Sequence, residues 1–593
     1  MHTPGDLKIN QAIATLLEAV QEVCLAKTHS MGGKQDPLNE IDALDTCLEK
    51  FTSKMHHIIA HYRRRYNANL PIHQLPPELM SHSLAFAMLP LLVEPTVTDI
   101  GYMRRLQRLA SVSSSWARLI KDTPSFWTNV SNEFSLPLVR QILSRSRSNL
   151  LDVKYIHETR AGMSANMFVS LVFDHVGRWR SVEINDGSGE STMIPILRAA
   201  QAPALETLRV VYGEYFPIRF HWVGPILCGK ADRLRDVDLV RFCIPWDTGT
   251  LRGLVSLKLE DLGEKGPMAH QLIDILSASP GLTTLHLYYL YSSTTGNRTG
   301  NVTSRGAGFL ELPALRTLRI SRLCPLLERT ILSAIRFQGR TNFNLNVDLH
   351  ETTGFFQDSS ISNFTSFFKT SIASSEDLVV FWNDTEINFE LRTSARCLIN
   401  LSVPGNWDSA PPVGLADALE ETASLHSQFV IKGDSSFQGI APLLQPKCKF
   451  TIIRLERTSR SVTESLIRFL TIPVTTDNAQ EWPVPDLEEL QVSYISDANL
   501  QAIVEMVTSR CEGQGTRGVD GATTELALNA CPLKRLLIRS NRQFKPHHLS
   551  ELQRILGEAN VSLEPAYEQE YLEEGDQEDE LDENPAFGQT VFA

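Results

Sequence analysis

The sequence of 593 residues contains no Cys-x-x-Cys pair, and its nine cysteines follow no repeated spacing. They stand at positions 24, 47, 228, 243, 324, 397, 448, 511 and 531. Structural zinc sites and secreted disulfide frameworks both need cysteines at recurrent short spacings. We therefore expect reduced, mostly buried thiols, with neither a metal nor a cofactor.

Long uncharged apolar runs are also lacking, since none reaches the roughly 18 residues that mark a membrane-spanning helix. No positively charged start precedes an apolar run at the N-terminus, and the segment Ile13 to Val20 is interrupted by Thr15 and Glu18. The sequence therefore predicts neither a signal peptide nor contact with a membrane. We expect an intracellular protein, in the cytoplasm, the nucleus or both.

Positive charge is in deficit, because 56 Lys and Arg residues stand against 69 Asp and Glu residues and the net charge is −13. Nucleic-acid binding needs a basic footprint, so nucleic acid is not an expected partner. The run Arg63 to Arg65 closes a predicted helix, where positive charge is favourable. A nuclear-import signal is the alternative interpretation of this run.

Catalytic signatures are missing as well. There is no Gly-x-Ser-x-Gly, no glycine-rich phosphate loop ending in Lys-Ser/Thr and no His-Glu-x-x-His. The adjacent pairs His56–His57 and His547–His548 point to different sides of a helix and make poor metal ligands. We expect no enzymatic activity, and an uncharacterised enzyme remains a third interpretation.

What the first 70 residues do contain is helical periodicity. Residues 1–38 combine an amphipathic piece, Leu7 to Leu25, with a flexible link around Gly32, Gly33 and Pro37. Residues 39–70 predict one longer helix, whose apolar stripe suits packing or a short coiled coil. The stripe consists of Ile41, Leu44, Leu48, Phe51, Met55, Ile58, Ile59, Tyr62 and Tyr66.

Residues 71–135 predict a small helical domain. The segment Leu75 to Leu79, Leu-Pro-Pro-Glu-Leu, reads as a helix start, because proline is tolerated in the first turn and glutamate suits the N-terminal dipole. A second apolar stripe follows, and Pro124 ends it ahead of Phe126 and Trp127. So short a unit, rich in Leu, Trp and Phe, carries more apolar surface than it can hide.

This combination resembles the F-box, and the whole chain is similar in pattern to F-box proteins of mushroom-forming fungi. It departs from the F-box at Ser113 to Ser115, where Cys and a basic residue often precede the Trp, and in the longer link Glu94 to Thr98. The resemblance implies binding to the Skp adaptor of SCF-type ubiquitin ligases and, through it, to a cullin. The implied adaptor-binding residues are Leu75, Pro76, Glu78, Leu79, Leu109, Val112, Trp116, Leu119, Ile120, Pro124, Phe126 and Trp127.

Between residues 140 and 565 the sequence changes to short recurrent units of the form Leu-x-x-Leu-x-Leu/Ile/Val. Alternate residues of a strand share a face, so the last two apolar residues of each unit turn inward. The first five units begin 29, 20, 28 and 33 residues apart, near the period of leucine-rich repeats. Seven units begin at Leu205, Leu234, Leu254, Leu282, Leu315, Leu487 and Leu533.

Helical stretches lie between many of these units, such as Met268 to Leu276 and Val462 to Leu470. Strand and helix in alternation predict a parallel sheet with helices on one side. The expected fold class is therefore α/β, in which N-terminal helices and a small all-α F-box-like unit precede an irregular leucine-rich-repeat solenoid. The pattern fades between residues 340 and 480, and the asparagine ladder of the family survives only at Asn541.

Residues 566–593 form an acidic tail with almost nothing to bury, so we expect it to be disordered. A solvating role is the default interpretation, and contact with a basic partner is the alternative.

The sequence thus predicts a non-catalytic substrate-recognition subunit of an SCF-type ubiquitin ligase. Its adaptor would bind residues 71–135, and an unknown protein target would bind exposed residues between the inward leucines. The alternative is a leucine-rich-repeat scaffold with no ubiquitin-ligase role, whose F-box-like segment caps the repeats or forms an ordinary helical hairpin. The proposed target-binding residues are Arg209, Lys258, His286 and Arg319.

Overall fold

The structure, a computed structural model, describes most of residues 37–565 and positions 14, 15, 17, 18, 21 and 22. The predicted helix at Leu7 to Leu25, the link Glu94 to Thr98, Asn541 and the acidic tail lie wholly or mostly outside the described residues. The gaps within 37–565 are 94–98, 158–162, 187–196, 198–199, 214–226, 228–230, 247–248, 264, 291–308, 338–342, 350–358, 384, 394–397, 405–414, 416–418, 420–425, 433–436, 446–449, 477–478, 494, 496, 513–532 and 541–543.

The chain divides into two compact units, Met1–Asn149 and Leu150–Ala593, which we call the N-terminal unit and the sheet unit. Helix α2 opens the described part of the N-terminal unit and spans 32 residues, close to the predicted range of 39–70. The elements of this unit are α2 (Pro37–Ala68), η1 (Pro71–Gln74), α3 (Pro77–Val93), α4 (Asp99–Val112), α5 (Ser114–Asp122), η2 (Pro124–Trp127), β1 (Asn129–Ser131) and α6 (Leu136–Arg145).

Local sequence explains where these helices begin. Helix α3 starts at the second proline of Leu-Pro-Pro-Glu-Leu, with Glu78 in its first turn. Ser113 caps α5, because its hydroxyl oxygen accepts a hydrogen bond from the Trp116 amide at 3.1 Å. The serine that departs from the F-box pattern therefore separates α4 from α5.

The core of the N-terminal unit gathers around Trp127. The indole Nε1 of Trp127 donates to the Ile120 carbonyl oxygen at 2.8 Å, and the Arg145 guanidinium lies 4.4 Å from the centre of its ring. The other buried side chains of α3, α4, α5 and η2 include Met80, Leu84, Met88, Tyr102, Met103, Leu106, Ile120 and Phe126.

The sheet unit is mixed α/β and contains one open, mostly parallel sheet. Its strands are β2 (Leu151–Ile156), β3 (Trp179–Asp186), β4 (Thr207–Tyr212), β5 (Asp236–Val240), β6 (Ser256–Gly263), β7 (Thr284–Leu290), β8 (Thr317–Ser321), β9 (Asn344–Asp348), β10 (Ser375–Trp382), β11 (Glu386–Thr393), β12 (Leu398–Pro404), β13 (His426–Lys432), β14 (Ile452–Glu456), β17 (Glu489–Ser493), β18 (Arg535–Arg539) and β19 (Val561–Glu564). Strands β15 (Val474–Thr476) and β16 (Ala479–Glu481) form a separate antiparallel pair.

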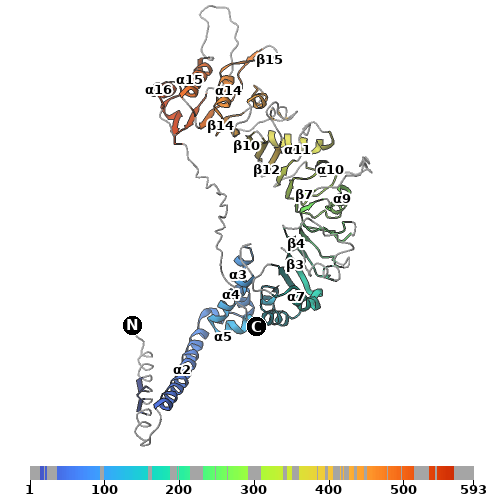
Figure 1. Cartoon of the computed structure of the whole chain (residues 1–593), viewed down its shortest axis with the longest axis vertical. Coiled ribbons are helices and arrows are strands. Elements are labelled where there is room, and N and C mark those ends of the chain that lie inside the picture. The colour runs from blue at the N-terminus through green and yellow to red at the C-terminus, as the bar shows by residue number, and fades with distance from the viewer. Residues whose placement is uncertain are drawn as a thin grey trace, which may run out of the picture. The chain divides into compact units, whose positions relative to one another are not determined.

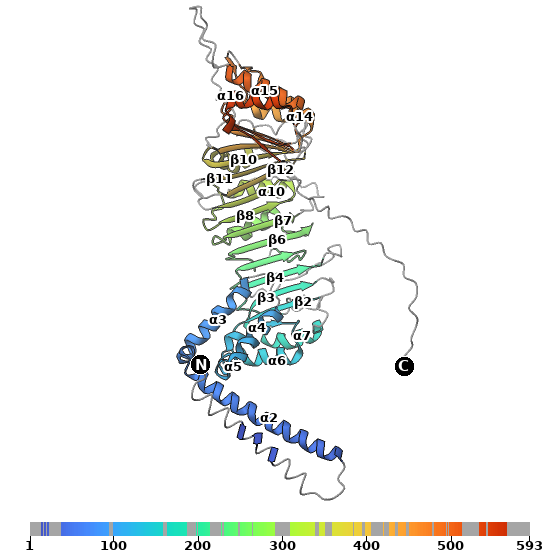
Figure 2. The same cartoon turned by 90° about the vertical axis from the view of Figure 1, so that its left-hand side faces the viewer.

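The helical segments of this unit follow the strands and lie on one face of the sheet (Figures 1 and 2). The opposite face, which we call the open face, carries no helix of the described sheet unit. The helical segments are α7 (Ala165–Val172), η3 (Phe173–Arg178), α9 (Ala269–Ser277), α10 (Pro325–Ala334), η6 (Ser359–Ile361), α11 (Ser362–Ala373), α13 (Phe437–Ile440), η7 (Ala441–Leu444), α14 (Arg460–Thr471), α15 (Asp497–Glu512), α16 (Pro546–Leu556) and η8 (Glu558–Asn560).

The leucine pattern predicts the inward face correctly. Leu254, for example, is buried just before β6, and Leu257 and Leu259 are buried within it, while Lys258 between them faces outward. The same arrangement recurs in four of the other six units, whereas the middle residues of the last two, Gln491 of β17 and Leu537 of β18, are also buried. Neighbouring strands keep the register, as in the pairing of Leu257 with Leu285. Burying two or three large apolar side chains per strand stabilises each unit by several kcal/mol before the entropy cost, at about 25 cal/mol per Å².

The continuous parallel order is interrupted between β9 and β13, within the range where the sequence pattern fades. The chain runs back through β10, β11 and β12, so the spatial order is β9, β12, β11, β10, β13. Strand β11 is antiparallel to both of its neighbours, and the prediction of an all-parallel ladder is wrong there. The turn into β11 is stabilised by Asn383, whose Oδ1 accepts from the amides of Thr385 and Glu386 at 2.9 and 2.7 Å.

Candidate protein-binding surfaces

The four predicted target-binding residues lie in one row across the open face. Arg209 of β4 pairs in register with Asp238 of β5, which pairs with Lys258 of β6. Lys258 in turn pairs with His286 of β7, and His286 with Arg319 of β8. The parallel register therefore brings together side chains that are 110 residues apart in the sequence.

Ion pairs occupy the first part of this row. Glu183 of β3 lies between Lys154 and Arg209, at 3.9 and 3.4 Å, and Asp238 lies between Arg209 and Lys258, at 3.4 and 4.0 Å. Each carboxylate therefore serves two cations. Exposed ion pairs contribute only about 0–1 kcal/mol each to stability. Replacing them by ion pairs with a bound protein target would therefore cost little.

The row ends in basic side chains without an intervening carboxylate. Arg319 is exposed and forms no ion pair within the described part of the chain. His286 lies between Arg319 and Lys258, and its pKa is lowered from 6.5 chiefly by burial and further by these two cations, while Asp238 acts in the opposite direction. The imidazole is therefore held neutral at pH values where a solvated histidine would begin to protonate.

This arrangement predicts how His286 titrates. Arg319→Gln should raise the pKa of His286 toward 6.5, and Asp238→Asn should lower it further. Because the folded pKa is depressed, the stability that the neutral ring provides is present above pH 6.5 and is lost as pH falls through the lowered pKa. An NMR titration of the full-length chain with isotope-labelled histidine measures this change in the pKa of His286. Thr207→Val, in the same face, is the control, and an unchanged pKa in Arg319→Gln would contradict the electrostatic account.

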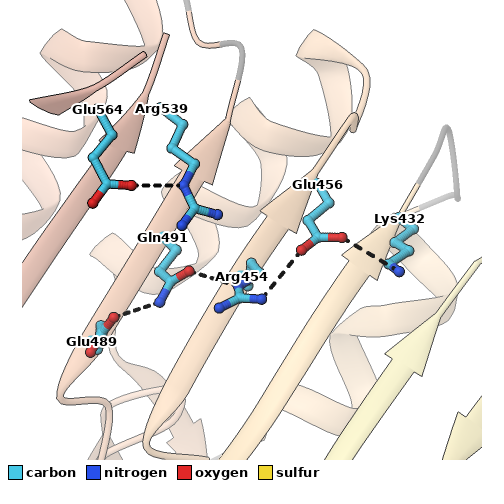
Figure 3. A network of polar contacts seen from close by, with 7 residues as sticks. All are labelled: Lys432, Arg454, Glu456, Glu489, Gln491, Arg539 and Glu564. Atoms are coloured by element: carbon cyan, nitrogen blue, oxygen red, sulfur yellow. Dashed lines mark hydrogen bonds and ion pairs between the residues drawn. The ribbon is translucent and has the colours of Figure 1, made fainter. Parts of the chain in front are cut away.

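A second polar network covers the open face near the C-terminal end of the sheet (Figure 3). Glu456 accepts from both sides, with Lys432 Nζ at 3.4 Å and Arg454 Nη1 at 3.4 Å. Arg454 Nε donates to Gln491 Oε1 at 2.6 Å, and Gln491 Nε2 donates to Glu489 Oε1 at 2.5 Å. Three adjacent strands, β13, β14 and β17, are therefore linked by side chains as well as by backbone.

This network was not predicted from the sequence. The signal that could have found it is the alternation within β14, where Ile453 and Leu455 are buried and Arg454 and Glu456 face outward. Beside the network, Arg539 Nε donates to Glu564 Oε2 at 3.1 Å across β18 and β19. The open face is therefore lined by charged side chains that are largely paired with one another.

The predicted adaptor-binding residues separate into three groups by burial. Leu75, Leu79 and Val112 are 40%, 56% and 53% exposed, and Pro76 and Glu78 are also exposed. Four residues are half-buried, and three lie in the core. The half-buried residues are Leu109, Trp116, Leu119 and Pro124, and the buried ones are Ile120, Phe126 and Trp127.

Leu75 and Leu79 of the exposed group belong to a longer apolar segment from Ile72 to Phe86, whereas Val112 is the last residue of α4. Ile72 and Phe86 are 43% and 74% exposed, and Leu75 and Leu79 lie between them in sequence. The spacing from Leu79 to Phe86 is two helical turns, so both side chains lie on the same side of α3. Trp116 is half-buried, and its indole Nε1 has no acceptor among the described residues. Several large exposed apolar side chains within one short segment are typical of protein interaction sites.

The described residues show no arrangement typical of catalysis. No group of three or more His, Cys, Asp or Glu side chains in the described ranges is placed to hold a metal ion. Burial raises the pKa of the Cys243 thiol to about 12, which makes its thiolate scarce at neutral pH. None of the helices in the described part of the chain combines the length and apolar composition needed to cross a membrane.

Comparison with models of known protein families found no match, and no curated protein proved similar in sequence.

Proposed function

We propose that this chain is a non-catalytic substrate-recognition subunit of an SCF-type ubiquitin ligase. In this proposal residues 71–135 are an F-box that binds the Skp adaptor, and the sheet unit is an irregular leucine-rich-repeat solenoid that binds a protein target. The observation that carries the proposal is the exposed apolar stripe at the Leu-Pro-Pro-Glu-Leu segment, in which Leu79 is 56% exposed.

Burial assigns different roles to the residues of the F-box pattern. Leu75, Leu79 and Val112 offer apolar surface to an adaptor, and the half-buried Trp116 offers the exposed part of its ring, while its indole N–H is buried. Phe126 and Trp127 are buried in the core, so they support the contact surface without being part of it. An adaptor helix laid along the start of α3 would cover Leu75 and Leu79.

The open face is the proposed site for the target. Its inward leucines build a rigid sheet, and its outward charges are held in rows by the strand register, which suits recognition of an extended or folded protein surface. At the end of the row, beside the neutral His286, the positive charge of Arg319 is not neutralised by an ion pair with the described residues, so acidic groups of a target fit there.

The test is co-elution of the purified full-length chain with the Skp adaptor in size-exclusion chromatography. Leu79→Asp should weaken binding by at least about 100-fold, because a charge would be desolvated at the centre of an apolar contact. Leu326→Asp is the matched control, since Leu326 is 52% exposed and also lies in the first turn of a helix.

Failure of the wild-type chain to bind the adaptor would overturn the proposal. Equal binding by wild type and Leu79→Asp would place the contact elsewhere and remove the observation on which the proposal rests. A chain that captures a protein target without binding any adaptor would be a scaffold.

A further inference from the structure

Helix α2 exposes large apolar side chains along most of its length. Leu48, Ile58, Tyr62 and Tyr66 are 62%, 47%, 54% and 69% exposed. A helix of 32 residues is about 48 Å long at 1.5 Å per residue, so this surface is an extended stripe and not an isolated spot. Helices that expose such a stripe are stable when another helix covers it.

The sequence of α2 places Leu48, Ile58 and Tyr62 of this stripe on a heptad repeat, and Tyr66 follows at a flanking e position. Positions of type a are Ile41, Leu48, Met55 and Tyr62, and positions of type d are Leu44, Phe51, Ile58 and Arg65. Seven of these eight residues are apolar, and they continue without a break from Ile41 to Tyr62. A heptad seam sustained over more than three repeats is typical of a left-handed coiled coil.

Charge selects the direction of the partner helix. From Pro37 to Phe51 the helix has four acidic residues and one lysine, whereas from Thr52 to Ala68 it has one lysine, three arginines and no acidic residue. Two parallel copies would set like charges side by side. Two antiparallel copies set the acidic half of each against the basic half of the other, which is favourable.

We propose that α2 pairs with α2 of a second copy of this chain in an antiparallel two-stranded coiled coil. In the register that joins each a position to a d position, Leu48 faces Ile58 of the other copy and Phe51 faces Met55. The twofold axis passes beside residue 53, so each contact occurs twice. This inference is independent of adaptor binding, because the seam uses α2 and the adaptor surface begins at Leu75.

Sedimentation equilibrium of the full-length chain measures the association. We expect a mass of twice 66.4 kDa for the wild type. Leu48→Glu with Ile58→Glu should give the monomer mass, since both charges enter the seam. The matched control is Thr46→Glu with Ser53→Glu, which adds the same charge at two outward f positions and should leave the dimer unchanged. Far-UV circular dichroism verifies that all variants keep their helices.

Reversing the basic half distinguishes the two directions. Arg63→Glu, Arg64→Glu and Arg65→Glu together should weaken an antiparallel dimer by at least about tenfold, because acidic residues would then face acidic residues. A parallel dimer would show no comparable loss, since the basic halves already repel each other, and that result would overturn the antiparallel arrangement.

A monomer at concentrations up to about 100 μM would overturn the proposal, since a specific interface should be occupied there. In that case residues 7–25 of the same chain would be the alternative occupant of the seam. A variant that loses the dimer and still binds the adaptor, or one that loses adaptor binding and still forms the dimer, separates this inference from the proposed function.

Discussion

Replacing Arg510 by alanine should lower the free energy of unfolding of the sheet unit by about 3 kcal/mol, one of the two largest effects that we expect. Arg510 lies in α15 and is fully buried. Its Nη1 donates to the Pro483 carbonyl oxygen at 3.0 Å and its Nη2 to the Val484 carbonyl oxygen at 2.9 Å. The guanidinium also lies 5.4 Å from the ring centre of Trp482.

The cost follows from what the variant leaves behind. The Pro483 carbonyl would lose its donor, the Val484 carbonyl would keep only the Leu487 amide at 3.2 Å, and a cavity would open beside Trp482. Val484 has a φ of 46°, a left-handed conformation that is unfavourable for a branched side chain, so the bonds from Arg510 also hold a strained turn ahead of β17.

Urea unfolding followed by circular dichroism measures this loss. Arg468→Ala is the control, because Arg468 is an exposed arginine on the neighbouring helix α14 and its replacement should change stability by less than about 0.5 kcal/mol. Arg510→Lys should recover only part of the loss, since an ammonium group cannot serve both carbonyls in the same planar geometry. If Arg510→Ala and the wild type unfolded with the same midpoint urea concentration, this account of Arg510 would be wrong.

Trp127→Ala should unfold the N-terminal unit, with an expected loss of about 3–5 kcal/mol. Trp127 is 6% exposed, bonds to the Ile120 carbonyl and lies under the Arg145 guanidinium. A small helical unit has only a few kcal/mol of net stability, so this loss exceeds what it can tolerate.

Hydrogen exchange over residues 71–135 is the suitable measurement, because a chain with two units need not unfold in one transition. Trp127→Ala should remove protection throughout this range, and Trp127→Phe should retain most of it. The informative comparison is Trp116→Ala, which should keep protection and weaken adaptor binding, since Trp116 is half-buried at the surface. Loss of protection in Trp116→Ala as well would place both tryptophans in the core.

The sequence predicted most of the sheet because each leucine unit encodes both a strand and its buried face. Leu257 and Leu259, or Leu536 and Ile538, are two residues apart, and that spacing alone directs them inward. The polar row from Arg209 to Arg319 could likewise be predicted as a set of outward positions. Its ion pairs could not, because they depend on register between strands that are 20 to 33 residues apart.

The missed parts share a physical reason. Strands β11 and β12 belong to a local meander whose apolar alternation, as in Ile387, Phe389 and Leu391, does not follow the Leu-x-x-Leu spacing. Arg510 was missed because a charged residue in a helix normally indicates a solvated face, and only tertiary structure shows the carbonyl groups that it satisfies. For the predicted adaptor-binding residues, the pattern did not separate surface from core, and their binding to an adaptor stays a prediction.

The reversed strand order at β10 to β12 has a consequence for how the sheet assembles. Strands from β2 to β9 can each dock on the edge left by the strand before, as the chain is synthesised. Beyond Asp348 this is no longer possible, because the edge of β9 accepts β12, which begins 50 residues later at Leu398. The meander must close first, and only then can β13 and later strands extend the sheet from β10. During synthesis the edge of β9 therefore stays unpaired until the residues of β12 have been added to the chain.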